Sequence, residues 1–476
     1  MLEPRSRTAP RKGRLATRRL KPFLCRTAKP LPSLDGRAGN RLNGRMLDIG
    51  LIRKESEAVR QRLLTRGKGA ADGLDKVLEV DEERRRLLGE VEKLKAERNA
   101  ISKEVGVRKA KKESADDLLA GMKEKSDRIA ELDKQAAEVE AKQEGLLLSI
   151  PNLPWEGCPK GSTAAENPVV STWGEPKKFD FKPKDHVALG EALGILDFAA
   201  SAKVSGSGFA VYRGEGARLE RSLISWMLNL HSGEHGYMEV SPPFLVRESS
   251  MVGTGQLPKF REDLYAVEGG ELFLVPTAEV PVTNLHRDEI LTEGDLPKKY
   301  AAYTPCFRRE AGSAGKETRG LGRMHQFDKV ELVWIEHPDR SMKALEELCQ
   351  HAESVLQKLG LHYRKIELCT GDIGFGAARC YDLEVWAPGM GQFLEVSSCS
   401  NFMDFQARRM GLRFKGADGK NRPCHTLNGS GTALARLFIA LVETYQTQEG
   451  GVTIPETLRS IFGSDRIGKE LSKPKP

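Results

Sequence analysis

The stretch Tyr303–Val333, YTPCFRREAGSAGKETRGLGRMHQFDKVELV, decides the fold. Residues 307–310 (Phe-Arg-Arg-Glu) are predicted to end one strand, and residues 322–327 (Gly-Arg-Met-His-Gln-Phe) to begin the next. The glycine-rich loop between them, Ala311–Leu321, carries two cations and is predicted to be mobile and suited to closing over an anion. The stretch therefore predicts an antiparallel strand pair with a binding loop at one end.

The loop end of this strand pair contains side chains that can bind a polyphosphate, a carboxylate, a purine ring and an ammonium group. They are Arg308, Glu310, Arg323, Phe327 and Glu331. Any one of them alone would favour a basic hairpin with a solvated loop, but the whole stretch closely resembles motif 2 of the class II aminoacyl-tRNA synthetases. In detail it is similar to the seryl-tRNA synthetases, and that resemblance extends from Met46 to about Phe462.

The composition indicates a large protein whose basicity is local. A chain of 476 residues is long enough for two or three domains. No apolar run reaches the length of about eighteen residues that a membrane span needs. The formal net charge is +8, but residues 1–45 hold ten arginines and three lysines against two acids, so they contribute +11 and the remainder −3. Nucleic-acid binding must therefore rest on local patches.

The basic segment 1–45 has two interpretations. Its arginine-rich, acid-poor composition fits a mitochondrial transit peptide. Several prolines and glycines and the lack of a sustained amphipathic pattern favour instead a disordered extension or a mis-assigned start, with the family-like beginning at Met46. We prefer the second interpretation and hence a cytoplasmic location, with the mitochondrion as the alternative.

The cysteines indicate neither a disulfide framework nor a zinc site. Eight are scattered along the chain, and none forms a CxxC pair. This spacing fits a reducing cytosol. Some distant seryl-tRNA synthetases depend on zinc, but nothing in this sequence points to it, so no zinc is expected.

A long charged region without proline predicts a helical arm. After a short helical segment at about 48–66, apolar residues step by three and four from Val77 to Val105 and again from Leu118 to Leu146. The short connection Gly106–Ser114 predicts an antiparallel coiled-coil hairpin. About thirty residues per helix, rising about 1.5 Å each, give an arm of roughly 50 Å.

A generic oligomerisation coil is the alternative for such an arm. Its cations, however, are clustered on the first helix and near the tip. They are Arg84, Arg85, Arg86, Lys93, Lys95, Arg98, Lys103, Arg108, Lys109, Lys111 and Lys112. Clustered cations on a stiff rod suit a phosphate backbone that is read by shape. The resemblance implies that the hairpin holds the long variable arm of tRNA(Ser).

The sequence Ile150–Pro154 (Ile-Pro-Asn-Leu-Pro) ends the second helix and marks the predicted domain boundary. Beyond it, strand-like runs alternate with helices and Gly/Pro turns, which indicates an α+β domain with a mostly antiparallel sheet. We expect three parts: a basic extension 1–45, a tRNA-binding helical arm 46–152 and a class II catalytic domain 153–476.

Three further stretches resemble other signatures of the class. A predicted helix at Arg218–Leu230 and strand at Gly236–Leu245 are similar to motif 1, which implies a homodimer. The Thr-Ala-Glu turn at 277–279 fits an ordinary helix N-terminus, and the resemblance assigns it to the serine site. His425–Arg436 is similar to motif 3, but Ala435 stands where the general motif has an acidic residue, which leaves the orienting partner of that arginine undefined.

Two predicted strands, Asp382–Trp386 and Phe393–Asn401, form a hairpin around Pro388 and Gly389. Strict alternation puts Glu395 and Ser398 on opposite faces unless the strand twists or bulges. The resemblance assigns this stretch to the binding of ATP and its magnesium. The carboxylate of Glu395 and the hydroxyl of Ser398 would supply the hard oxygen ligands that Mg²⁺ requires. A buried polar ladder is the alternative.

The resemblance implies a complete set of site residues. Catalysis is assigned to Arg308, Glu310, Arg323 and Arg436. Serine binding is assigned to Thr277, Ala278, Glu279, Arg308, Glu331, Asn428 and Ser430. ATP binding is assigned to Arg308, Arg309, Glu310, Arg323, Phe327, Glu395, Val396, Ser397, Ser398 and Arg436, and magnesium binding to Glu395 and Ser398.

The implied reaction is ATP-dependent ligation of L-serine to tRNA(Ser) through seryl-adenylate, with tRNA(Sec) left open as a second substrate. The serine carboxylate is already ionised, so catalysis rests on positioning and charge neutralisation. Two other classes are weighed. An amino-acid ligase that charges a carrier protein is expected to lack the arm, and a dead tRNA-binding paralogue is expected to lose the arginines or Glu331.

Overall fold

The computed structural model describes residues 47–311 and 320–468. The chain divides into two compact units, 1–43 and 44–476, and the first lies wholly outside the described residues. The predictions for segment 1–45 and for most of the loop 311–321 therefore fall outside them as well. Within the described ranges, no helix is both long and apolar enough to cross a membrane.

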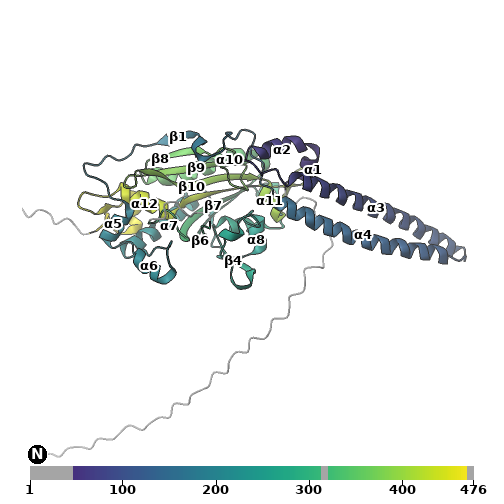
Figure 1. Ribbon diagram of the computed structural model, residues 1–476. Coiled ribbons are helices and arrows are strands. Elements are labelled where there is room, and N and C mark those ends of the chain that lie inside the picture. Colours follow the sequence, from purple (N-terminus) through teal and green to yellow (C-terminus); the bar gives the residue numbers. More distant parts are fainter. Residues whose placement is uncertain (1–46, 312–319, 469–476) are drawn as a thin grey trace, which may run out of the picture. The chain divides into compact units, whose positions relative to one another are not determined.

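Two long antiparallel helices confirm the predicted arm (Figure 1). They are α3 (Leu74–Ala110) and α4 (Asp116–Leu148), preceded by α1 (Ile49–Lys54) and α2 (Ser56–Leu64). The predicted connection was too long, because residues 106–110 still belong to α3. Val105 is buried there, and the Arg, Lys and Ala that follow are good helix formers.

Several of the clustered cations form ion pairs within the arm. Arg84 pairs with Glu140 at 3.2 Å, and Lys95 pairs with Asp133 at 3.3 Å. These two pairs join α3 to α4, so the cations brace the hairpin as well as adding positive charge to it.

An eight-stranded sheet forms the centre of the second half. Its order is β1-β8-β9-β10-β13-β7-β6-β2, and all neighbouring pairs are antiparallel except β2 with β6. The strands are β1 (Val169–Trp173), β2 (Met238–Glu239), β6 (Lys298–Phe307), β7 (Gln326–Glu336), β8 (Tyr363–Glu367), β9 (Arg379–Ala387), β10 (Gln392–Met403) and β13 (His425–Ala433). This arrangement confirms the α+β prediction with a mostly antiparallel sheet.

The remaining elements surround this sheet. The other helices are α5 (His186–Leu193), α6 (Phe198–Ser205), α7 (Glu215–Gly233), α8 (Glu248–Gly253), α9 (Glu279–Thr283), α10 (Ser341–Lys358), α11 (Phe405–Met410), α12 (Leu434–Thr444) and α13 (Glu456–Phe462). Smaller sheets contain β3 (Leu245–Arg247), β4 (Leu272–Leu274), β5 (Ile290–Thr292), β11 (Arg413–Lys415), β12 (Asn421–Pro423), β14 (Val452–Thr453) and β15 (Arg466–Ile467). Helix α10 packs against β13 and β10, where Leu348 lies against Gly429, so one face of the sheet is covered.

Some predicted strand ends were wrong. The strand that was to include Glu310 ends at Phe307, and the next begins at Gln326 instead of Gly322. Glu310 has a positive φ of 51°, which turns the chain away from an extended path. Of the strand predicted for Gly236–Leu245, only the two residues of β2 and the first residue of β3 are in strands, since the two consecutive prolines between them cannot donate to a ladder.

Candidate active site

A cavity of about 650 Å³ lies over the face of the sheet that α10 leaves open. Most of the predicted site residues line it. They are Thr277, Glu279, Arg308, Glu310, Arg323, Phe327, Glu331, Glu395, Val396, Ser398, Asn428, Ser430 and Arg436. Three predicted residues, Ala278, Arg309 and Ser397, are not part of the lining.

The end of the β6–β7 hairpin holds two arginines beside an aromatic ring. The Nε of Arg308 donates to the backbone oxygen of Pro276 at 3.3 Å, and its guanidinium carbon lies 5.2 Å from the centre of the Phe327 ring. The Nη1 of Arg323 lies 2.6 Å from a carboxylate oxygen of Glu310. The left-handed backbone at Glu310 is uncommon for a residue other than glycine, and such strain is typical of functional sites.

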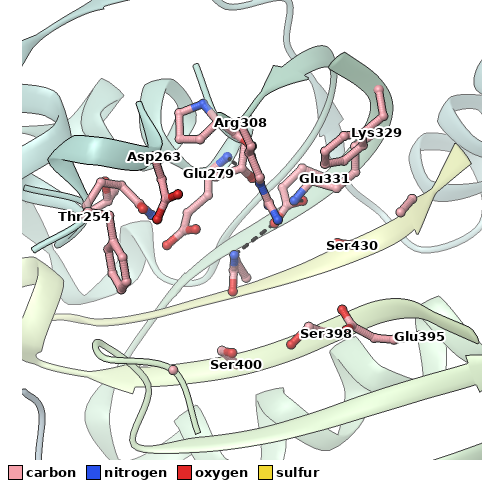
Figure 2. A pocket seen from close by; sticks show the side chains of 18 of the residues that line it. Thr254, Asp263, Glu279, Arg308, Lys329, Glu331, Glu395, Ser398, Ser400 and Ser430 are labelled. Carbon is pink, nitrogen blue, oxygen red and sulfur yellow. Dashed lines mark hydrogen bonds and ion pairs between the residues drawn. The ribbon is translucent and has the colours of Figure 1, made fainter. Parts of the chain in front are cut away.

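Glu331 is fully buried at the floor of the cavity, with its charge compensated. One carboxylate oxygen lies 2.6 Å from the ammonium nitrogen of Lys329, and the other accepts a hydrogen bond of 2.9 Å from Asn428 (Figure 2). Sequence reasoning missed this lysine. The two-residue spacing of Phe327, Lys329 and Glu331 would have indicated that all three share one face of β7.

A second buried carboxylate, Glu279, begins α9. Its oxygen accepts a hydrogen bond of 2.6 Å from Gln406, whose amide also donates to the backbone oxygen of Thr254 at 3.2 Å. Burial, and next the negative charge of Glu331, raise the pKa of Glu279 to about 7. The hydroxyl of Thr277 accepts a long hydrogen bond of 3.4 Å from the backbone N–H of Glu279, while the N-cap position of α9 itself is Ala278.

A bulge in β10 turns two predicted magnesium ligands to the same side. Glu395 pairs with Glu384 on β9, but the next partner of the strand is Ser397, so Val396 is the extra residue. Alternation therefore shifts by one position, and Glu395 and Ser398 both line the cavity (Figure 2). The hydroxyl of Ser397 points away, donating to the backbone oxygen of Ser430 at 2.6 Å.

The orienting partner that the sequence left undefined for Arg436, on α12, comes from strand β10. Its Nη1 donates to the backbone oxygen of Glu395 at 2.8 Å and lies 3.5 Å from the carboxylate of the same residue. Its Nε donates to the backbone oxygen of Gly322 at 3.2 Å. The acidic neighbour missing at Ala435 is thus replaced by Glu395.

One wall of the cavity was not predicted. It contains Thr254, Gly255, Gln256, Phe260, Asp263, Gly374, Phe375, Gly376 and Ala377. The glycines near 374 were a signal for close backbone approach, but sequence alone did not indicate what they approach. Burial also raises the pKa of Asp382, which pairs with Ser398 across β9 and β10, to about 8.

Known proteins resemble the chain over both halves. The family model for the seryl-tRNA synthetase N-terminal domain matches residues 46–154, and that for the class II tRNA synthetase core domain (G, H, P, S and T) matches residues 264–445. A serine–tRNA ligase of Akkermansia muciniphila is 57% identical over 89% of this chain and 100% of its own length. One from Methylacidiphilum infernorum is 54% identical with the same coverage. The seryl-tRNA synthetase of Pyrococcus horikoshii, solved with ATP, has a TM-score of 0.83 and 39% identity, covering 89% of this chain and 99% of its own.

Proposed function

This chain belongs to the seryl-tRNA synthetase family, and we propose that the cavity over β6, β7, β10 and β13 is the site where it activates serine. The chain carries the activity of that family, ATP-dependent ligation of serine to tRNA. One observation carries the proposal for the site: predicted residues from four separate stretches line one cavity.

The proposed first step forms seryl-adenylate. The carboxylate of serine attacks the α-phosphorus of ATP in line, a new C–O–P linkage forms, and the bond to pyrophosphate breaks. No proton has to move, so positioning and neutralisation of charge supply the catalysis. Arg308 would bridge the carboxylate and the α-phosphate, while Arg323 and Arg436 would hold the outer phosphates. The pairing of these two arginines with Glu310 and Glu395 supports this, because paired side chains are preorganised.

The adenine ring would stack on Phe327, with Glu310 beside its amino group. Serine would lie deeper, between the two buried carboxylates. Glu331 and Glu279 would attract the ammonium group, and Asn428, Thr277 and Ser430 would surround the small side chain. The burial of both carboxylates supports this assignment, since a cation that enters relieves their mutual repulsion.

The proposal also includes a magnesium ion bound in the cavity. Glu395 and Ser398 would hold it, and the bulge that turns both toward the cavity supports their fit. Two protein oxygens suffice, because Mg²⁺ commonly keeps several waters and binds substrate phosphates as well. When bound, the ion would neutralise phosphate charge; the chain's own arginines orient the phosphates.

The division into parts and the partners are also proposed. Residues 46–152 would be the tRNA-binding arm, and residues 153–476 the catalytic domain. A homodimer would form at the β2 edge of the sheet, where Met238 is 63% exposed, together with the exposed Phe244 and Leu245 that follow β2 in the chain. A cytoplasmic location is proposed with tRNA(Ser) as the partner, and a charging assay with tRNA(Sec) decides whether that RNA is a second substrate.

The site proposal is tested with Glu331→Gln. We expect severe loss of serine-dependent ATP–pyrophosphate exchange, because the buried lysine keeps its charge while its carboxylate partner is lost. The control is Glu336→Gln, on the same strand but paired with Arg340 outside the cavity. The wild type should reject alanine by roughly 10⁴-fold, since alanine leaves polar groups of the pocket unpaired. Near-normal exchange in the Glu331 variant, or alanine activated within about tenfold of serine, would overturn the proposal.

A further inference from the structure

A short loop between β8 and β9 supplies part of the unpredicted wall of the cavity. Gly374, Phe375, Gly376 and Ala377 all line it. The loop, residues 368–378, contains three glycines and no helix or strand of its own, so its shape depends on what its backbone groups contact.

Five consecutive carbonyl groups of this loop accept hydrogen bonds from Arg66 and Asn152. Arg66 precedes α3 and Asn152 follows α4, so both lie at the end of the arm next to the sheet domain, here called the root of the arm. Arg66 donates through Nη1 to residues 373 and 374, at 3.2 and 3.1 Å, and through Nη2 to residue 377. Asn152 donates its backbone N–H to residue 375 and its side-chain amide to residue 376, both at 2.9 Å.

The two donors are also joined to each other, and both have little exposure to water: Asn152 is buried and Arg66 is partly buried. The Nε of Arg66 donates to the backbone oxygen of Asn152 at 2.6 Å. Asn152 is 4% exposed, and burial lowers the pKa of Arg66 to about 10. Among the described residues Arg66 has no carboxylate partner within ion-pair distance, so carbonyl oxygens are its acceptors. Removing a guanidinium even partly from water costs free energy, and in this structure the hydrogen bonds to the loop carbonyl groups offset that cost.

The loop borders the end of the cavity that holds Glu279. Phe405 lies close to both Gly376 and Gly255, and its neighbour in sequence, Gln406, donates to Glu279. The rings of Phe375 and Phe260 pack edge to face, with their centroids 6.2 Å apart. The loop therefore adjoins the proposed serine pocket.

We propose that Arg66 and Asn152 are positioning residues for serine activation, which hold the loop 373–377 in the shape that the serine pocket requires. This inference rests on the proposed function of the cavity. It makes the root of the arm part of the amino-acid site, whereas the outer arm contributes nothing to that site. No other side-chain type substitutes for Arg66, because only a guanidinium presents several fixed donors in one plane.

The test is Arg66→Lys, which keeps the positive charge and loses the planar guanidinium with its several hydrogen-bond donors. We expect the KM for serine in ATP–pyrophosphate exchange to rise about tenfold or more, with the KM for ATP changed less than about twofold. Asn152→Ala should act in the same direction, more weakly, since its backbone donor remains.

The matched control is Arg62→Lys. Arg62 lies in the same root and donates to the backbone oxygen of Pro154 instead of the loop. Because Arg62 makes one such bond and Arg66 makes four, the control should lose less thermal stability, and it should keep its KM for serine. A merely structural role of Arg66 would give the two lysine variants the same kinetics.

The inference is overturned if Arg66→Lys and Asn152→Ala both keep the KM for serine within about twofold of wild type. It is overturned as well if neither variant folds, because the residues then act on stability. Lack of serine-dependent exchange in the wild type would instead refute the proposed function, so the two failures are distinguishable.

Discussion

Replacing Glu279 by glutamine should make the protein more stable at alkaline pH and less active. Burial and the charge of Glu331 raise the pKa of Glu279 from 4.5 to about 7. The folded protein thus keeps this proton up to about pH 7, whereas the unfolded chain loses it near pH 4.5. The contribution of Glu279 to stability is therefore present at low pH and is lost as the pH rises through this window.

The size of the effect follows from the same shift. Each pKa unit corresponds to about 1.4 kcal/mol, so ionised Glu279 costs the folded state about 3 kcal/mol above pH 7. An unfolding entropy of about 2.1 cal/mol/K per residue over roughly 430 residues converts this into a rise in Tm of about 3 °C for Glu279→Gln. The substituted amide keeps an oxygen that can accept from Gln406.

The assay compares thermal unfolding of wild type and Glu279→Gln without ligands at about pH 8 and about pH 5, with the exposed Glu262→Gln as control. The Tm difference should be present at the higher pH and largely gone at the lower. In exchange assays kcat/KM for serine should fall below about pH 7 in the wild type, and the variant should be weakly active without that inflection. A Tm that is unchanged or lower at pH 8 would refute the reasoning.

The remaining predictions concern the arginines, the arm and the first residues. Arg308→Ala should slow pyrophosphate exchange by about 10²-fold or more, equivalent to about 3 kcal/mol of barrier. The control Arg422→Ala, which removes a cation that pairs with Asp418 and does not line the cavity, should not slow it. Near-normal exchange in the Arg308 variant refutes its role. Replacing residues 84–140 with a short glycine-rich linker should keep serine activation and abolish charging of tRNA(Ser), and comparable charging efficiency would contradict the function of the arm. Starting the chain at Met46 should leave full aminoacylation activity, since every predicted site residue lies beyond it; loss of activity on removing residues 1–45 would show that they contribute.

Sequence reasoning predicted the elements whose cause is local. The two series of apolar residues that step by three and four predicted both helices of the arm, because this spacing is repeated many times. Most of the residues that the motif-like stretches predicted do line the cavity, because each stretch carries its side chains on one strand or turn, although the larger part of the lining was not predicted. A strand with strict alternation, however, would have separated Glu395 from Ser398; only the ladder to β9 reveals the bulge at Val396.

What sequence reasoning missed depends on contacts between distant segments. Lys329 compensates Glu331 inside the cavity, and Glu395 orients Arg436 from a strand that precedes it by about forty residues. The loop 373–377 acquires its shape from Arg66, some three hundred residues earlier. No pattern within either segment encodes such a pairing, since each donor would fit many acceptors.

ATP–pyrophosphate exchange by the wild-type protein, with each standard amino acid supplied separately, tests the central claim most directly. The buried carboxylates and the small polar pocket predict exchange that depends on serine, with alanine weaker by roughly 10⁴-fold and threonine excluded less sharply by its extra methyl group. Exchange that depends on a different amino acid, or a folded protein with no serine-dependent exchange, would contradict the assignment of this cavity to serine activation.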